Sequence, residues 1–305
     1  MSALWSPFAK PWVIAHRGAS GLLPEHCLPG YALAIEQGCD VIEPDLVASA
    51  DGWLFARHDL GLRRSTDIAT RTEFVGRQRA GPDGVEDWWI SDFQAAELDR
   101  LRAIQPWPQR PRHRDGAFSI PRFAAILDLL LLERRRRQRP LQLYPELKHP
   151  RYFLERGIDL VAALLAELAP RGLLGRDAPV LVQCFDLPTL LRLRERCGLR
   201  LILLCDELPD LDETAVDGYG IRKSALLDSA SGPAFIAAAH ARGRMLHAWT
   251  FRDDQPAPGL APLDECANAF AAGCDGLFCD FPATALRARD TLSTLGESHA
   301  EALPA

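Results

Sequence analysis

The chain has 305 residues, of which 48% are hydrophobic and 25% are charged. This composition is ordinary for a globular protein and excludes a largely disordered chain. The formal net charge of −6 argues against a nucleic-acid-binding protein, because such binding needs a concentrated basic surface.

The eight cysteines are scattered and include no C-x2-C pair, so they predict buried thiols in a reducing compartment rather than a zinc site. The first residues lack the charged and apolar regions of a secretory signal. No apolar stretch reaches the roughly 18 residues that a membrane span requires. We therefore expect a cytoplasmic protein without a transmembrane segment.

Short apolar runs alternate with helical patterns along the chain, which is typical of successive βαβ units and a parallel sheet. Eight strands are predicted, at residues 12–15, 41–46, 141–147, 180–184, 200–204, 218–221, 245–249 and 276–279. Eight helices are predicted, at residues 28–37, 121–138, 154–169, 187–197, 207–215, 232–242, 262–272 and 283–295. Eight of each predicts an α/β fold, a (β/α)8 TIM barrel that forms a single domain over residues 1–305.

Two segments break this repeat. Residues 53–59, WLFARHD, follow the strand at 41–46 after a short turn that contains Asp51 and Gly52. They are expected to form a hairpin arm, since a parallel strand would need a longer crossover. Residues 61–119 are too long for an ordinary loop and are expected to form an insertion. Because this connection leaves the C-terminal end of a strand, the insertion should lie on the C-terminal face, where substrate binds.

Polar residues lie at the C-terminal ends of the apolar strands. They include His16, Arg17, Glu43, Asp45, Glu146, Lys148, Gln183 and Trp249. A buried carboxylate or imidazole is costly unless it is paired or bound to a metal. In a barrel these strand ends converge on one face, so we expect the residues to form one site.

Three of these residues, Glu43, Asp45 and Glu146, are carboxylates, and the first two share one side of their strand because side chains alternate. They offer oxygen ligands without a thiol, which predicts one divalent cation, Ca²⁺ or Mg²⁺, rather than zinc. Taken alone, Glu43 and Asp45 would more often be a surface pair. Their combination with the other motifs favours the metal site.

Two histidines, His16 and His58, offer an acid and a base near pH 7, while Arg17 and Lys148 offer positive charge for phosphoryl oxygens. The hairpin should return His58 to about the level of Asp45. We predict that His58 is the base and His16 the acid. Taken alone, His16 could be a core histidine and His58 a turn residue.

Two further strand residues have open interpretations. Gln183 could fill a layer of the barrel or contact substrate, because a buried amide is tolerated when it is hydrogen-bonded. Trp249 could belong to the core or form a wall for a glycerol group.

Seven segments resemble, in order, the signature segments of the glycerophosphodiester phosphodiesterase family. They are AHRGASGLLPEH (15–26), IEPDL (42–46), HD (58–59), PELK (145–148), QCFD (183–186), HAWT (247–250) and GLFCDFP (276–282). The resemblance spans roughly residues 12–286 and is closest to the GlpQ-type bacterial enzymes, because LPEH stands where many members have PEN. Cys184 and Cys279 stand where Ser and Thr are frequent, and neither replaces a motif carboxylate or histidine.

The resemblance implies a (β/α)8 barrel with an insertion after the HD strand, and metal-dependent hydrolysis of glycerophosphodiesters to sn-glycerol 3-phosphate and an alcohol. It implies catalytic roles for His16 and His58, metal binding by Glu43, Asp45 and Glu146, and phosphate contacts for Arg17 and Lys148. Two alternatives stay open. One is a lysophospholipase D-type phosphodiesterase whose insertion accommodates an acyl chain, and the other is a catalytically silent barrel that binds phosphorylated ligands.

Overall fold

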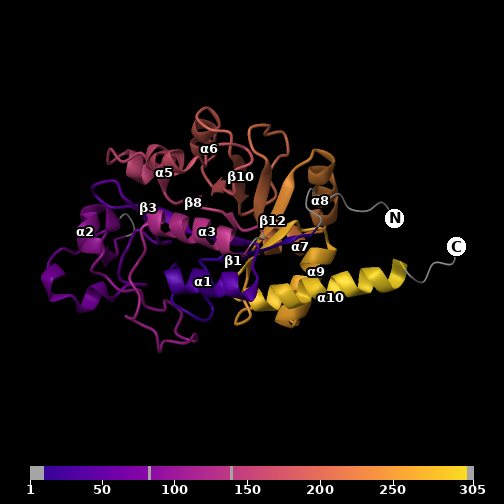
Figure 1. Cartoon of the computed structure of the whole chain (residues 1–305), viewed down its shortest axis with the longest axis horizontal. Coiled ribbons are helices and arrows are strands. Elements are labelled where there is room, and N and C mark those ends of the chain that lie inside the picture. The colour runs from indigo at the N-terminus through magenta and orange to yellow at the C-terminus, as the bar shows by residue number, and fades with distance from the viewer. Residues whose placement is uncertain (1–9, 82–83, 138–139, 301–305) are drawn as a thin grey trace.

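The computed structural model describes residues 10–81, 84–137 and 140–300, and a parallel barrel lies at its centre (Figure 1). The barrel strands are β1 (Trp12–His16), β2 (Val41–Glu43), β3 (Asp45–Ala48), β7 (Gln142–Leu143), β8 (Glu146–Leu147), β9 (Leu181–Cys184), β10 (Arg200–Cys205), β11 (Gly218–Arg222), β12 (Met245–Phe251) and β13 (Gly276–Cys279). In the described chain β2 and β3 are consecutive pieces of one barrel strand, and β7 and β8 are consecutive pieces of another. The ten strands therefore occupy eight strand positions around the barrel. Pairing of β13 with β1 and of β8 with β9 closes the ring. The predicted (β/α)8 barrel is confirmed.

Prolines interrupt two of these strand positions. Pro44 separates β2 from β3, and Tyr144 and Pro145 separate β7 from β8. Proline has no amide hydrogen, so it leaves a gap in the ladder of hydrogen bonds. The pairing resumes at once, because the Glu146 amide donates to the Pro44 carbonyl at 2.9 Å. The unbroken strands predicted at 41–46 and 141–147 are therefore wrong in detail.

Alternate strand residues fill the interior of the barrel. The interior cluster consists of Trp12, Ile14, Val41, Tyr144, Leu181, Ile202, Met245 and Phe278. Intervening residues such as Val13 and Ile42 pack instead in the larger core that includes helix residues. Because side chains alternate, the inward row of each strand continues toward its C-terminal end in steps of two residues. On β1 that row runs from Trp12 through Ile14 to His16.

Helices cover the outside of the barrel (Figure 1). They are α1 (Leu28–Gln37), α3 (Phe123–Arg137), α4 (Pro150–Leu154), α5 (Leu160–Leu168), α6 (Leu187–Arg194), α7 (Lys223–Leu227), α8 (Gly232–Ala241), α9 (Pro262–Ala271) and α10 (Pro282–Ala300). The carboxylates of Asp159 and Asp186 accept backbone amide hydrogens at the starts of α5 and α6, as N-caps do. Among the described helices, none has the length and hydropathy needed to cross a membrane.

Two helix predictions are wrong. Residues 207–215 form turns and loop instead of a helix in the described structure. Pro209 disfavours helical backbone at Leu208, and the aspartates in this segment favour turns. The helix predicted at 154–169 is divided into α4 and α5 around Gly157, whose φ of 76° lies in the left-handed region.

The hairpin predicted after the second strand is confirmed. Strand β4 (Leu54–Ala56) runs antiparallel to β3, and the Arg57 amide donates to the Asp45 carbonyl at 2.9 Å. The pairing therefore returns His58 to within one residue of the level of Asp45.

The segment 61–119 has short elements of its own. Its described parts contain η1 (Asp67–Thr70), η2 (Thr72–Phe74), β5 (Arg79–Ala80), β6 (Glu86–Asp87), η3 (Ile90–Asp92) and α2 (Ala95–Leu98). Buried Phe74, Trp88 and Phe93 join its interior to the main core. Figure 1 shows this segment at the left end of the molecule, beyond β3.

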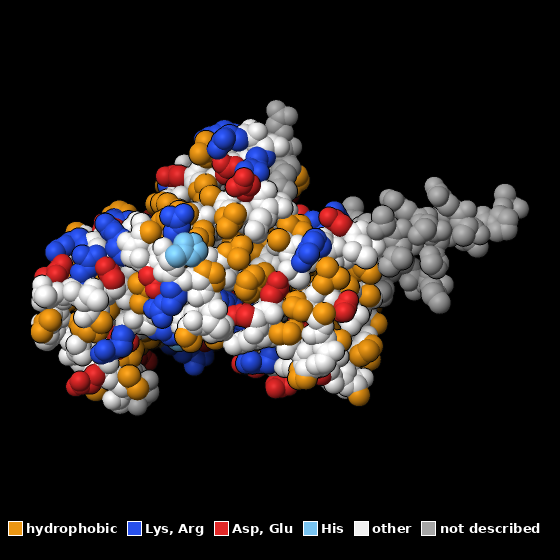
Figure 2. Space-filling view, turned by 90° about the horizontal axis from the view of Figure 1, so that it is seen from below, with side chains coloured by type: hydrophobic (Ala, Val, Ile, Leu, Met, Phe, Trp, Pro, Cys, Tyr) orange, Lys and Arg blue, Asp and Glu red, His pale blue; other side chains and the backbone are white. Residues whose placement is uncertain are grey.

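Charged side chains of both signs lie on the face of the molecule that Figure 2 shows. On this face, acidic and basic side chains of the described residues are interspersed among hydrophobic ones.

Candidate active site

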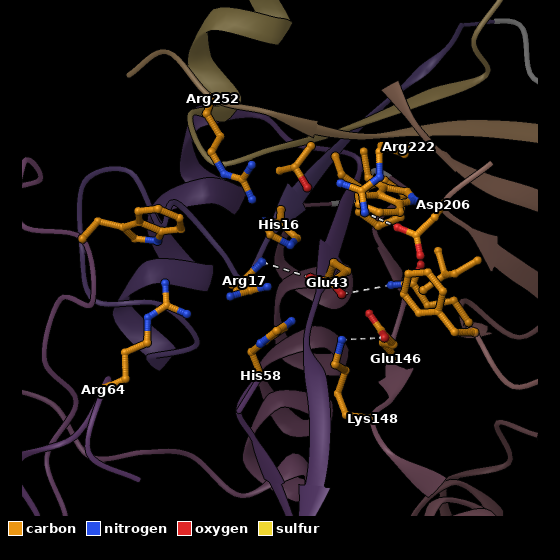
Figure 3. Close-up of a pocket in the computed structure, with 17 residues that line it drawn as sticks. His16, Arg17, Glu43, His58, Arg64, Glu146, Lys148, Asp206, Arg222 and Arg252 are labelled. Atoms are coloured by element: carbon orange, nitrogen blue, oxygen red, sulfur yellow. Dashed lines mark hydrogen bonds and ion pairs between the residues drawn. The ribbon is translucent and has the colours of Figure 1, made fainter. Parts of the chain in front are cut away.

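The inward rows become polar at the C-terminal end of the barrel. Glu43 follows Val41 there, and Gln183 follows Leu181, two positions along each strand. These side chains line a cavity of about 340 Å³ (Figure 3). The predicted site residues that line it are His16, Arg17, Glu43, His58, Glu146, Lys148, Gln183 and Trp249. Asp45 completes the predicted set through its contacts with Arg17 and Lys148.

Glu43, Asp45 and Glu146 form a buried acidic cluster. One carboxylate oxygen from each lies within 4.8 Å of the others. Asp45 on β3 is the register partner of Glu146 on β8, and Glu43 is the last residue of β2. A set of oxygen ligands on neighbouring strands suits a hard cation such as Ca²⁺ or Mg²⁺. The cluster therefore fits the predicted metal.

Burial and electrostatic repulsion between neighbouring carboxylates shift the pKa values in this cluster. Burial, and then repulsion from Asp45 and Glu146, raises the pKa of Glu43 well above its usual range. Burial also raises the pKa of Glu146 to about 8. Although burial opposes it at Asp45, the positive charges of Arg17 and Lys148 hold the pKa of that carboxyl well below its usual range. A bound cation would offset this repulsion.

Arg17 is fixed by a tight turn after β1. The next residue, Gly18, has a φ of 82°, and a Cβ there would lie 2.7 Å from the backbone of α1, so glycine is required. The turn lets the Arg17 amide donate to Oε2 of Glu43 at 3.1 Å. The guanidinium lies 2.9 Å from Glu25 and 3.0 Å from Asp45.

Lys148 brings a second cation to the acidic cluster. Its Nζ atom lies 2.8 Å from Oε1 of Glu146 and 4.0 Å from Oδ1 of Asp45. Lys148 stands two residues after Glu146, and both side chains line the cavity. Arg17 and Lys148 thus bring two positive charges to the cavity, and their contacts with a phosphate remain predictions.

His16 is held by an acid from the other end of the chain. Its Nδ1 lies 2.6 Å from Oδ1 of Asp280, which follows β13. Burial, and then the charge of Arg17, lower the pKa of His16 to about 4, so the ring is neutral near pH 7. Because a carboxylate accepts hydrogen bonds, Nδ1 carries the hydrogen, and Nε2 is the nitrogen left to accept a proton.

His58 is the more exposed of the two histidines. It follows β4, and its Nδ1 lies 2.6 Å from Oδ1 of Asp59. Asp59 in turn accepts a hydrogen bond from Arg64 at 3.4 Å. The His58 side chain is 32% exposed and that of His16 is 11% exposed. The pair therefore combines one buried and one solvated imidazole in the same cavity.

Gln183 supports an acidic side chain. Its Nε2 donates to Oε1 of Glu43 at 2.9 Å, while its Oε1 has no hydrogen-bond partner among the described residues. Trp249 donates from Nε1 to the Gly220 carbonyl at 3.0 Å and packs edge-on against Phe185. Both line the cavity, and their contacts with substrate remain predictions.

Sequence reasoning missed some of the residues that hold this site. His26 lies with Nε2 3.0 Å from Oδ2 of Asp45 and Nδ1 2.9 Å from the Tyr31 hydroxyl. The segment LPEH contained this signal, since a histidine stands beside Glu25. Glu25, in the same segment, accepts a hydrogen bond from Arg17 at 2.9 Å and so is a partner of a site residue.

Arg110, in the insertion, was also missed. Its Nη2 donates to Oδ2 of Asp280 at 2.6 Å, and Nε of Arg252 donates to the same oxygen at 3.1 Å. The many arginines of the insertion gave no means of selecting this one from the sequence.

The fold and the site together define a class: a (β/α)8 barrel hydrolase with a cluster of three carboxylates, two histidines and two cationic side chains gathered at one cavity. The sequence pattern of the Glycerophosphoryl diester phosphodiesterase family matches residues 16–284. The chain belongs to this family. The predicted resemblance and enzyme class are therefore confirmed.

Known relatives agree with this assignment. The chain is 28% identical over 320 residues to glycerophosphodiester phosphodiesterase GDPD6 of Arabidopsis thaliana, across 90% of this chain and 84% of the relative. It is 31% identical over 188 residues to a glycerophosphodiester phosphodiesterase of Haemophilus influenzae, across 60% of this chain and 51% of the relative. The chain thus spans most of the plant relative but about half the length of the bacterial one.

A solved structure supports the fold. A phosphodiesterase of Oleispira antarctica, determined in complex with the product sn-glycerol-3-phosphate, superposes with a TM-score of 0.71. The two chains share 23% identity, and the alignment covers 92% of this chain and 97% of the other.

Proposed function

We propose that this protein hydrolyses small glycerophosphodiesters to sn-glycerol 3-phosphate and an alcohol, with one divalent cation, Ca²⁺ or Mg²⁺. The observation that carries this proposal is the meeting of three carboxylates, two histidines, Arg17 and Lys148 in one cavity. Family membership and the product bound to the Oleispira relative support the choice of substrate.

Glu43, Asp45 and Glu146 would hold the cation, because each offers a carboxylate oxygen within 4.8 Å of the other two. When bound, the cation supplies positive charge to a phosphoryl oxygen. Gln183 keeps the Glu43 carboxylate in place through its 2.9 Å hydrogen bond. His26 does the same for Asp45 through a 3.0 Å hydrogen bond, and the Nε atom of Arg17 forms an ion pair with Asp45 at 3.0 Å.

Arg17 and Lys148 would bind the remaining phosphoryl oxygens. Both side chains line the cavity next to the acidic cluster, as Figure 3 shows. Their charges act where negative charge develops, in a partly dry site that strengthens the interaction.

We assign His16 as the base and His58 as the acid, the reverse of the assignment made from sequence. The neutral Nε2 of His16 takes a proton from the nucleophile, which is water or the neighbouring glycerol hydroxyl, while Nδ1 keeps its hydrogen bond to Asp280. The nucleophile's oxygen bonds to phosphorus as the P–O bond to the alcohol breaks, and His58 gives its proton to the leaving oxygen. Where the glycerol hydroxyl attacks, water then opens the resulting cyclic phosphate in a second step, with the two histidines in exchanged roles. Burial decides between the two histidines, because it keeps His16 uncharged and leaves His58 in contact with solvent.

The cavity favours a small diester over a lysophospholipid. Arg64, Arg222 and Arg252 are among the residues that line it, and a long acyl chain would need an apolar channel in place of these side chains. A catalytically silent barrel is disfavoured, because the proposed catalytic histidines and the acidic cluster are all in position.

A coupled assay for released glycerol 3-phosphate tests the proposal. The metal-free protein should be inactive and should regain turnover with CaCl2 or MgCl2. Glycerophosphoglycerol, glycerophosphoethanolamine and glycerophosphocholine should be cleaved faster than lysophosphatidylcholine. Faster cleavage of the lysolipid would favour the lysophospholipase D alternative, and no cleavage of any diester would favour the silent barrel.

A further inference from the structure

Arg110 is a buried arginine that connects the insertion to two aspartates of the barrel. It is 4% exposed. Its guanidinium donates two hydrogen bonds to the Asp254 carboxylate, from Nε at 2.9 Å and from Nη2 at 3.0 Å. The same Nη2 donates to Oδ2 of Asp280 at 2.6 Å. This planar fork fixes the guanidinium, which in turn fixes one oxygen of Asp280.

The other oxygen of Asp280 contacts His16. The distance from Oδ1 to Nδ1 is 2.6 Å, so the plane of this carboxylate sets both the orientation and the tautomer of the imidazole. Arg252 also contacts Oδ2 of Asp280, but it lines the cavity and is 25% exposed in its side chain. Of the two arginines that donate to Asp280, Arg110 is therefore the buried one.

A second connection reaches the backbone of His16. Nη1 of Arg110 donates to the Ser20 carbonyl at 3.3 Å, and the Ser20 hydroxyl donates to the His16 carbonyl at 2.9 Å. Gln105, five residues earlier in the insertion, donates to the Ser20 carbonyl at 3.1 Å and to the Leu23 carbonyl at 3.2 Å. The end of the insertion thus holds the loop that follows β1 as well as the imidazole.

We propose that Arg110 is a positioning residue that holds His16 in its reactive orientation through Asp280. The insertion then contributes to the chemical step as well as to substrate binding. This proposal rests on the proposed function, in which His16 is a catalytic residue. Arg110 is not among the described residues that line the cavity, so it acts on the reaction through Asp280 and His16.

The first test compares Arg110→Met with Arg110→Lys. Methionine keeps much of the length and removes the charge, whereas lysine keeps the charge but cannot span both aspartates. We expect kcat to fall about 10- to 100-fold for Arg110→Met, a fraction of the effect of losing an acid or base, and less for Arg110→Lys, with KM nearly unchanged in both. Arg77→Met is the matched control, because Arg77 also joins elements of the insertion, through Glu97 and the Asp92 carbonyl, and lies outside the cavity lining. Its kcat should match that of the unmodified protein.

A double-mutant cycle separates positioning from general loss of structure. If Arg110 acts through His16, Arg110→Met should lower kcat by less than about threefold in a His16→Ala background, because contacts within one network are not additive. In a His58→Ala background it should keep its full effect. A p-nitrophenyl phosphodiester keeps these slow variants measurable. Equal effects in both backgrounds would overturn the proposal.

A spectroscopic readout is independent of turnover. In protein labelled with ¹⁵N-histidine, the His16 signals are identified by their loss in His16→Gln, and they should show a single tautomer with the hydrogen on Nδ1. Arg110→Met should give a mixture of tautomers, whereas Arg77→Met should not. If Arg110→Met does not fold, Arg110→Met/Asp254→Asn removes both charges of the pair and is compared with Asp254→Asn. An unchanged His16 spectrum overturns the proposal, whereas an unmodified protein that shows the tautomer but cleaves no diester overturns only the proposed function.

Discussion

The Nδ1 atom of His16 lies 2.6 Å from Oδ1 of Asp280, although 264 positions separate the two residues in the chain. Asp280→Asn should lower kcat about 10²- to 10⁴-fold, because the amide can present an N–H group to Nδ1 and favour the wrong tautomer. Steady-state kinetics well below the melting temperature would check this. A kcat close to that of the unmodified protein would show that the contact is structural.

The two histidines should respond differently to the leaving group. On alcohol-leaving substrates His16→Ala and His58→Ala should each lose about 10²- to 10⁴-fold in kcat. A p-nitrophenyl phosphodiester needs no protonation of its leaving oxygen, so His58→Ala should recover much of its rate on it and His16→Ala should not. Recovery by His16→Ala instead would restore the assignment made from sequence.

Removal of the metal should abolish turnover without unfolding the barrel, because the interior apolar cluster is independent of the acidic residues. Treatment with EDTA, followed by circular dichroism and the coupled assay, measures both properties. Glu146→Lys should behave like the metal-free protein, whereas Glu146→Gln should weaken metal binding less completely. Full activity in protein shown to be free of metal would refute the ligand assignment.

The stability of the metal-free protein should depend on pH. Burial raises the pKa of Glu146 from 4.5 to about 8. Between these values the folded protein keeps a proton that the unfolded chain has lost, so the free energy of unfolding decreases as pH rises. The melting temperature without metal should thus be lower at pH 8 than at pH 5, and CaCl2 should raise it more at pH 8. Glu146→Gln should flatten this dependence, and a melting temperature that rises over this range would contradict the argument.

The tryptophans that line the cavity should contribute little to the binding of a cationic headgroup. The guanidinium of Arg222 lies 4.8 Å from the ring centre of Trp249, and that of Arg64 lies 5.1 Å from the ring centre of Trp107. Because these ring faces already carry a cation, we expect glycerophosphocholine to have a higher KM than glycerophosphoglycerol. Arg222→Ala should narrow the difference about two- to fivefold, the size of an exposed cation–π contact. An unchanged ratio of KM values would exclude this role.

Much of the site was predictable because it follows from strand geometry. Apolar residues every second position identify the inward row, and the polar residue that continues it must lie at the end of the barrel. This reasoning placed His16, Glu43 and Glu146 in one cavity, and the hairpin placed His58 beside them.

Other features depend on the path of loops and on burial, which short-range patterns do not specify. Arg110 meets Asp280 across 170 positions, and its selection among the arginines of the insertion depends on where that loop returns to the barrel. The proposed acid and base roles likewise rest on the difference in burial between His16 and His58, which the sequence does not specify. The segment 207–215 carried an apolar pattern too weak to overcome Pro209 and the aspartates.

Apolar side chains close the barrel interior beneath the cavity, so the site has no passage through the barrel. Trp12, Ile14, Tyr144 and Phe278 are each at most 8% exposed and occupy the interior beneath the cavity. Under the proposed reaction, substrate, water and both products must therefore exchange through the same opening. In the proposed reaction the alcohol leaves beside His58, the more exposed histidine, so we expect it to depart before the phosphoryl product.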